Sequence, residues 1–137
     1  QVASIARSIL EHSEWVLVTR ASQQAFDAVH SEMPDSEYDA SARTIVVDRR
    51  EKRDRVPGVM VVCGGTLDLP VAREATVTAE LMDCEVERVS DVGVAGIHRL
   101  LDQIPALQRA RVIVAVAGMD NLYGDYLGCI CMSDGGK

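Results

Sequence analysis

The apolar residues of this chain form helical stripes and short runs that alternate along the sequence. Near the start they recur every three or four residues, the spacing of one helix face: Val2, Ile5, Ala6, Ile9 and Leu10. A short apolar run at 15–19 predicts a strand, and Ser22 can cap a second helix. Further strands are predicted at 37–39 and 44–47. Together these elements predict a small α/β subdomain within residues 1–56.

A charged segment at 48–55 separates this subdomain from the rest of the chain. It has no apolar period, and Pro57 and Gly58 close it. We interpret it as a solvated connection. Acidic residues are interleaved with its basic ones, and a basic docking patch is the alternative reading.

The pattern changes after Gly58. The run 59–63 is continuously apolar, as in a strand buried on both faces of a parallel sheet. A turn at 64–68 follows, and Pro70 suits the first position of a helix. The residues expected to face inward from that helix are Val71, Ala75, Ala79 and Met82.

The same order of elements then repeats. A strand is predicted at 85–89, a helix at 95–107 and a third buried strand at 111–117. The helix residues expected to face inward are Ile97, Leu100, Leu101 and Ile104. A β-α-β-α-β order is typical of an α/β fold with a three-layer, doubly wound parallel sheet of the flavodoxin-like kind. We assign it to 57–120, incomplete at its C-terminal side, and 121–137 forms a divergent tail.

Composition narrows the class of protein. The chain has 137 residues, and its net charge of −7 argues against nonspecific nucleic-acid binding. No apolar run approaches the length that spans a bilayer, so no membrane partner is expected. The cysteines do not form C-x-x-C pairs, which favours reduced thiols in a cytoplasmic protein and no metal site. They are Cys63, Cys84, Cys129 and Cys131.

Parallel strands point one way, so the loops that follow them should meet at one edge of the sheet. In the first loop, Gly64 and Gly65 let the backbone approach a ligand closely. Thr66 can donate a hydrogen bond to a phosphate. Asp68 can accept or orient a proton, and simple capping of the helix is the alternative role.

The second and third loops add further candidates. His98 can carry a proton near neutral pH, and a structural or exposed histidine is the alternative. Arg99 can hold a carboxylate or phosphate with two hydrogen bonds. In the third loop, Gly118 is a candidate for substrate binding and Asp120 for catalysis. Asp91, before His98, suggests a helix-capping turn.

Four strings of residues give a specific resemblance. They are Leu-Val-Thr-Arg-Ala-Ser at 17–22, Val-Val-Cys-Gly-Gly-Thr-Leu-Asp-Leu-Pro-Val-Ala at 61–72, Asp-Val-Gly-Val-Ala-Gly-Ile-His-Arg at 91–99 and Val-Ala-Gly-Met at 116–119. With them the chain resembles the LarB family of nickel-pincer cofactor biosynthesis proteins. These carry a domain related to PurE, the aminoimidazole ribonucleotide carboxylase of purine synthesis. The resemblance covers most of residues 1–119.

The resemblance implies an activity. LarB proteins carboxylate the pyridinium ring of nicotinic acid adenine dinucleotide and hydrolyse its phosphoanhydride, releasing AMP. Gly65, Thr66 and Asp68 match the phosphate and substrate loop, and His98 with Arg99 matches the His-Arg pair of the purine carboxylases. The implied partners are a nucleotide substrate, carbon dioxide or bicarbonate as co-substrate, and further copies of the chain in a homo-oligomer. No tightly bound cofactor is expected, although Mg²⁺ could take part.

The chain departs from the family pattern at three places. Gly64 stands where the family has Ala, and Asp120 where it has Glu. The later strand, its glycine-rich loop and the helix with the nucleophilic cysteine have no counterpart, and neither Cys129 nor Cys131 lies in a matching context. We therefore expect a fragment or a degenerate copy. The alternatives are a PurE-type carboxylase or mutase of purine biosynthesis and a non-catalytic, nucleotide-binding remnant.

Overall fold

The computed structural model describes residues 1–92 and 97–118, and the chain divides into two compact units between Asp54 and Arg55. In the first unit, a three-stranded antiparallel sheet has the order β1-β3-β2. Its elements are α1 (Val2–Leu10), β1 (Trp15–Val18), α2 (Gln23–Glu32), β2 (Glu37–Asp39) and β3 (Thr44–Asp48). These elements confirm the small α/β subdomain predicted from the sequence.

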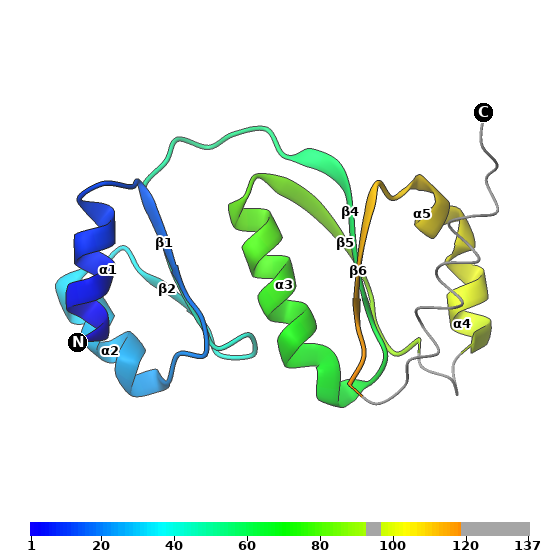
Figure 1. Ribbon diagram of the computed structural model, residues 1–137, viewed down its shortest axis with the longest axis horizontal. Coiled ribbons are helices and arrows are strands. Elements are labelled where there is room, and N and C mark those ends of the chain that lie inside the picture. The colour runs from blue at the N-terminus through cyan, green and yellow to red at the C-terminus, as the bar shows by residue number, and fades with distance from the viewer. Residues whose placement is uncertain (93–96, 119–137) are drawn as a thin grey trace. The chain divides into compact units, whose positions relative to one another are not determined.

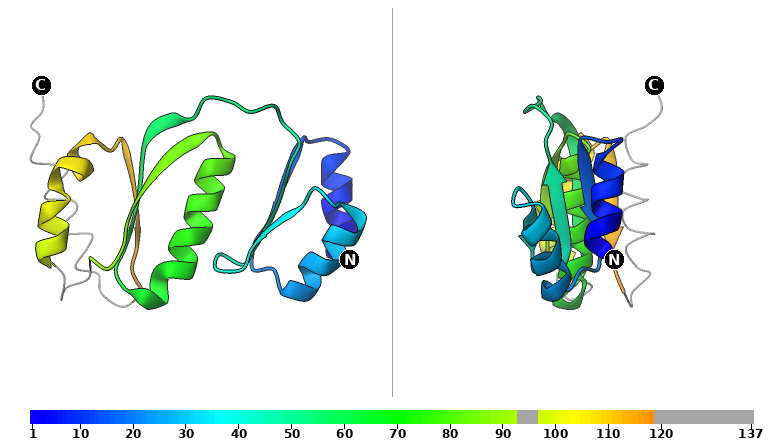
Figure 2. Two further views of the ribbon diagram at one scale, coloured as in Figure 1. Left: turned by 180° about the vertical axis from the view of Figure 1, so that it is seen from behind. Right: turned by 90° about the vertical axis from the view of Figure 1, so that its left-hand side faces the viewer.

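Helices α1 and α2 cover one face of this sheet (Figures 1 and 2). Val16, Ile45 and Val47 point toward them and are buried with Val29 in one core. The predicted cap of α2 is confirmed, since the Ser22 hydroxyl accepts a hydrogen bond of 3.2 Å from the Ala25 amide. That bond fixes the start of the helix.

The predicted inward face of α1 is partly wrong. Ala3 and Ala6 are the buried residues, whereas Ile5 is 55% and Ile9 44% exposed. Alanine side chains let a helix lie close to its neighbours, so the contact side of α1 is the alanine side. The larger residues Ile5 and Ile9 lie to the side of this contact and remain exposed.

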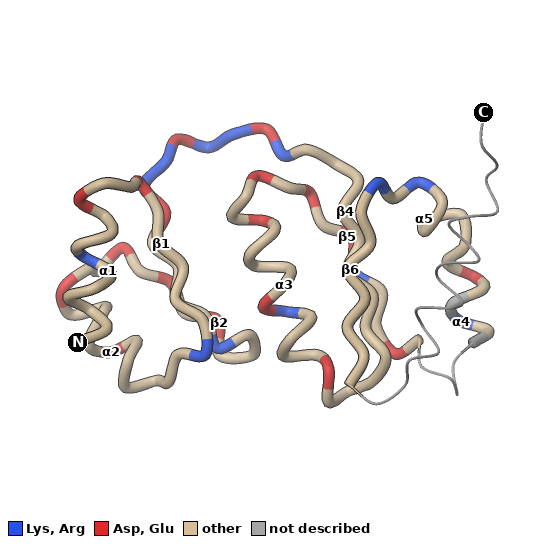
Figure 3. The backbone as a smooth tube through the Cα atoms, in the orientation of Figure 1, with Lys and Arg blue, Asp and Glu red and all other residues tan. Residues whose placement is uncertain are grey.

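The charged segment after β3 is a connection without regular structure, in which basic and acidic residues alternate (Figure 3). Arg49 bonds to Asp35 at 2.6 Å and Arg50 to Asp48 at 2.8 Å. Arg50 also lies 5.5 Å from the centre of the Trp15 ring. Since these arginines have acidic partners inside the chain, the structure gives no support to a basic docking patch.

The second unit contains a three-stranded parallel sheet of order β5-β4-β6. Helix α3 covers one face, and α4 and α5 cover the other (Figure 1). The elements are β4 (Val56–Cys63), the 3-10 turn η1 (Thr66–Asp68), α3 (Leu69–Leu81), β5 (Cys84–Val89), α4 (Ile97–Asp102), α5 (Ile104–Arg109) and β6 (Val112–Val116). The predicted three-layer α/β fold with a parallel, flavodoxin-like sheet is confirmed.

The helices of this unit differ from prediction in two respects. The single helix expected at 95–107 is two helices, because the chain turns at Gln103 and Pro105 lies in the first turn of the second one. As a result Leu107 is buried and Leu101 is 49% exposed. Ile97 and Leu100 were also expected to face inward, but their side chains are not among those that the structure describes.

In α3 the buried residues are Ala72, Thr76 and Leu81, whereas Val71 and Met82, both expected inside, are exposed. Two of these three buried residues, Ala72 and Thr76, have small side chains. Burial on both faces holds for β4, where residues 60–63 are fully buried. It fails for β6, which lies at the sheet edge and leaves Val112 53% exposed.

No helix within residues 1–92 and 97–118 combines the length and the apolar character that crossing a membrane requires.

Candidate functional site

The carboxyl ends of the three parallel strands meet at one edge of the second unit. Cys63, the last residue of β4, pairs with Val116 of β6. The Gly64 amide donates to the Val116 carbonyl at 3.0 Å, and the Val92 amide donates to the Cys63 carbonyl at 3.3 Å. The loops after β4 and β5 and the end of β6 are therefore joined by backbone hydrogen bonds, and the predicted common rim is confirmed.

The strand order locates one position on this rim where a ligand is favoured. The chain runs from the central strand β4 to one side, β5, and then crosses to the other side, β6. Ligands in open α/β sheets bind where the connections diverge in this way, outside the carboxyl ends of the strands. Here that position lies between β4 and β6, so it is bordered by the Gly64–Gly65 turn and by Gly118.

Asp68 stands at this position. It occupies the N-cap position of α3, yet its side chain makes no capping hydrogen bond. Its own amide donates to the Gly65 carbonyl at 3.0 Å, which closes the 3-10 turn, and the Cys63 thiol lies 3.3 Å from the same carbonyl. Simple capping therefore does not account for the half-buried Asp68 carboxylate.

Two glycines leave the space that the Asp68 carboxylate fills. A Cβ atom at Gly118 would lie 3.0 Å from Asp68 Oδ1, and one at Gly65 would lie 4.0 Å from Asp68 Oδ2. The first distance is tighter than ordinary van der Waals contact, so Gly118 admits the carboxylate because it has no side chain. The structure thus brings Gly65, Asp68 and Gly118 together, with Gly64 beside them.

A cationic group lies at the β5 side of the rim. Arg99 Nη1 of α4 donates to Asp91 Oδ2, and both side chains are exposed. Asp91 is next to Val92, whose amide is bonded to the end of β4. Arg99 comes from α4 and Asp68 from the start of α3, two helices that cover opposite faces of the sheet.

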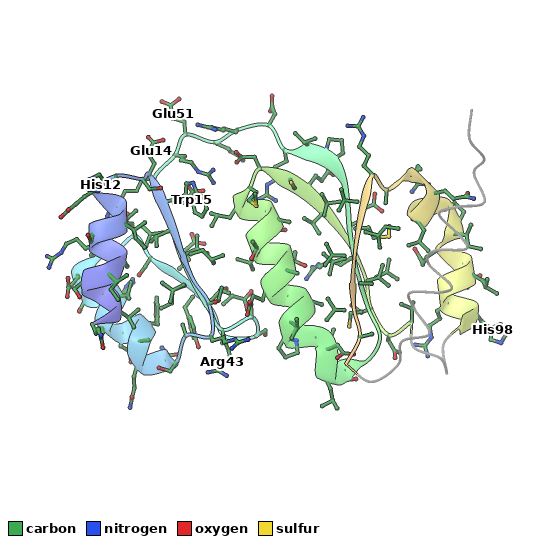
Figure 4. The ribbon with its side chains drawn as sticks, in the orientation of Figure 1. His12, Glu14, Trp15, Arg43, Glu51 and His98 are labelled. Carbon is green, nitrogen blue, oxygen red and sulfur yellow. The ribbon has the colours of Figure 1, made fainter. Side chains whose placement is uncertain are left out.

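The other predicted site residues are placed differently. Thr66 is exposed in η1. His98 is exposed, and its side chain points away from the sheet on the outer side of α4 (Figure 4). The structure does not bring His98 to the group around Asp68. Asp120 lies outside the described residues, as do Cys129 and Cys131.

Within residues 1–92 and 97–118, no three His, Cys, Asp or Glu residues are grouped so that they could hold a metal ion. The groups that the structure offers at the rim are the backbone of a glycine turn, a carboxylate and a guanidinium. Backbone amides and a guanidinium suit a phosphorylated ligand, and a carboxylate beside them can accept a proton.

Sequence reasoning missed two features of this site. It assigned Gly118 to substrate binding and did not foresee the contact with Asp68. It also treated Asp91 as a capping turn, whereas Asp91 is the ion-pair partner of Arg99. Both features depend on where separate strand ends lie in space, and no local pattern encodes them.

The fold and the rim define an α/β protein with a parallel sheet and a candidate site at its topological switch point. Residues 1–59 match the family model described as the LarB/PurE-like N-terminal domain. This match supports the LarB/PurE-like superfamily, a superfamily of the carboxylase and mutase type.

The chain is also similar to a curated protein of Methanocaldococcus jannaschii, "Uncharacterized protein MJ0165". The two are 38% identical over 92 residues, which are 63% of this chain and 35% of that protein. The chain thus spans about a third of the length of the curated relative that it matches.

Proposed function

We propose that this chain forms part of a LarB-like enzyme that acts on nicotinic acid adenine dinucleotide. The substrate would gain a carboxyl group on its pyridinium ring and lose AMP by hydrolysis of its phosphoanhydride. The observation that carries the proposal is the Asp68 carboxylate, held without a capping bond between Gly65 and Gly118 at the switch point of the sheet. The LarB/PurE-like match over residues 1–59 supports a superfamily of the carboxylase and mutase type, to which such an enzyme would belong.

Each proposed role follows from the chemistry of the reaction. In the carboxylation a carbon–carbon bond forms to carbon dioxide, and the ring carbon loses a proton, which Asp68 would accept. In the hydrolysis water adds to a phosphorus atom, and the bond between the two phosphates breaks. The amides of the Gly64–Gly65 turn, the Thr66 hydroxyl and the N-terminus of α3 would bind phosphate oxygens.

Arg99 would neutralise a phosphate or carboxylate at the other side of the rim. His98 carries no step in this proposal, because it points away from the site. Asp120 stays a prediction, as do Mg²⁺, the cytoplasmic location and the homo-oligomer.

The test is an incubation of the purified chain with nicotinic acid adenine dinucleotide and bicarbonate. We expect release of AMP, measured by chromatography, and its loss in Asp68→Ala. Turnover of aminoimidazole ribonucleotide in place of AMP release would favour the PurE-type carboxylase or mutase. A chain inactive with both substrates would be the non-catalytic remnant.

A further inference from the structure

The ion pair between Asp91 and Arg99 is built into the rim by its backbone. Asp91 has a φ of 59°, in the left-handed region, which aspartate and asparagine adopt more readily than most residues other than glycine. The next residue, Val92, is tied by its amide to the Cys63 carbonyl at the end of β4. The backbone next to Asp91 is thus bonded to the end of β4, while Arg99 comes from α4, on the next segment of the chain.

The ion pair between Asp91 and Arg99 contributes little to the stability of the fold. The side chains of Arg99 and Asp91 are 60% and 65% exposed, and ion pairs exposed to this degree contribute little to folding. An arginine on the surface has many accessible rotamers, so a fixed carboxylate beside it mainly restricts where the guanidinium lies.

The pair leaves most of the guanidinium available. Only Nη1 of Arg99 has a hydrogen-bond partner among the described residues. A guanidinium has five N–H donors, and its remaining edge can bind two oxygens of a phosphate at once. The Gly64–Gly65 turn, where the proposed phosphate contacts lie, is at the neighbouring strand end.

We propose that Asp91 is a positioning residue, which holds Arg99 so that the guanidinium binds the phosphoanhydride of the dinucleotide. The inference rests on the proposed function, because that function supplies the anion. Asp91 itself does not contact the substrate and acts through Arg99. Its negative charge opposes anion binding, but water and salt screen this opposition at an exposed site, so the gain from orientation is expected to dominate at physiological salt.

The proposal is tested by a double-mutant cycle with Asp91→Asn and Arg99→Ala, measured as KM and kcat for AMP release. Arg99→Ala should raise KM by about tenfold or more, the loss expected for a charge-assisted contact. Asp91→Asn should raise KM by about threefold to tenfold and leave kcat within about twofold, because it alters binding and not the chemical step. Adding Asp91→Asn to Arg99→Ala should cost nothing further, since Asp91 acts only through Arg99.

Asp102→Asn is the matched control. It removes the same charge from α4 itself, and Asp102 is exposed and has no partner among the described residues. Its KM should equal that of the unchanged chain. The proposal is overturned if Asp91→Asn behaves like Asp102→Asn, or if it still weakens binding when Arg99 is absent.

The failure of the proposed function can be told apart from the failure of this inference. If the unchanged chain releases no AMP, the same cycle is measured as the Kd for nicotinic acid adenine dinucleotide by calorimetry. A loss in Asp91→Asn that depends on Arg99 would then support the positioning role without catalysis. No binding by the unchanged chain would overturn both proposals.

Discussion

At the scale of single residues, the candidate site depends on a glycine, Gly118, as much as on the side chains around it. Asp68 lies where it does because Gly118 has no Cβ, which would stand 3.0 Å from Asp68 Oδ1. Gly65 is less demanding, since its Cβ would lie 4.0 Å from Asp68 Oδ2 and its φ of −153° is open to any residue. The two glycines can therefore be compared directly.

Gly118→Ala is expected to push the Asp68 carboxylate out of its position. A Cβ at 3.0 Å asks the carboxylate to move by a few tenths of an ångström, and a displacement of about 1 Å can cost about a hundredfold. We therefore expect kcat/KM for AMP release to fall by roughly threefold to fivefold. The unfolding free energy should change by less than about 1 kcal/mol, because Gly118 is exposed at a strand end. Gly65→Ala should lose clearly less activity, and an equal loss in both variants would show that the Asp68 clearance is not the cause.

A second residue-scale prediction concerns the stability of the first unit at low pH. The Arg50 guanidinium donates hydrogen bonds to Asp48, and these lower the pKa of Asp48 below its ordinary 3.8 even though partial burial opposes them. An Asp whose pKa is lowered on folding stabilises the fold above its unfolded-state pKa, and this contribution is lost as the pH falls through the folded value. Asp35, bonded to Arg49, has a lowered pKa for the same reason.

Urea unfolding followed by the fluorescence of Trp15, the only tryptophan, measures this effect in the first unit. The midpoint should stay level between about pH 7 and pH 5 and fall below about pH 4. Asp48→Asn should reduce that acid-dependent fall. The exposed Asp54→Asn should leave it unchanged, and an equal effect of both variants would contradict the role of the Arg50 contact.

At the scale of elements, the break between α4 and α5 decides which leucine enters the core. Leu107 is buried against Met60, Val62 and Val92, whereas Leu101 in the preceding helix is half exposed. The apolar spacing of a single helix predicted Leu101 inside, and the turn at Gln103 separates it from the helix that contains Leu107. One leucine therefore stabilises the sheet, and the other does not.

Leu107→Ala should lower the unfolding free energy of the second unit by about 2 to 4 kcal/mol, the usual cost of an alanine at a buried leucine. Leu101→Ala removes the same atoms from an exposed position and should cost less than about 1 kcal/mol. Denaturant unfolding of the two variants, monitored by circular dichroism, makes the comparison. Equal losses would mean that the helix is continuous, as its apolar spacing suggested.

These elements also show how far the sequence alone could lead. The strands and their parallel order were predictable, because short apolar runs such as 59–63 and 111–117 alternate with segments of helical spacing. The buried sides of α1 and α3 were not, since an apolar pattern does not distinguish alanine from larger residues, and alanines are among the buried residues of both helices. The rim was predictable from the parallel rule, but the contact of Asp68 with Gly118 and the pair of Asp91 with Arg99 required coordinates.

At the scale of the whole molecule, the two units have separate hydrophobic cores. The first is centred on Val29, Ile45 and Val47, and the second lies on both faces of β4. A charged connection joins the units. Units with separate cores and an apolar-poor linker are expected to unfold as separate cooperative steps.

Ile45→Ala tests this independence. Ile45 is fully buried in the first core, so the variant should lower the midpoint of the Trp15 fluorescence transition, with a loss of about 2 to 5 kcal/mol. Cys63 is buried in the second core, and its labelling by a thiol reagent, read from the Cys63 peptide by mass spectrometry, reports on that unit. The urea dependence of Cys63 labelling should not change. A parallel shift of both signals would show that the units unfold together.

The backbone bonds at the rim join the loops after β4 and β5 and the end of β6. Because the amides of Gly64 and Val92 point to carbonyls on neighbouring strands, their protons should be shielded from exchange with deuterated water to a similar degree. Loosening the loop after β5 would then speed exchange at Gly64 as well, although Gly64 belongs to a different loop. A structural change near Arg99 would in this way alter the surroundings of the Asp68 carboxylate, because the backbone hydrogen bonds connect the two sides of the rim.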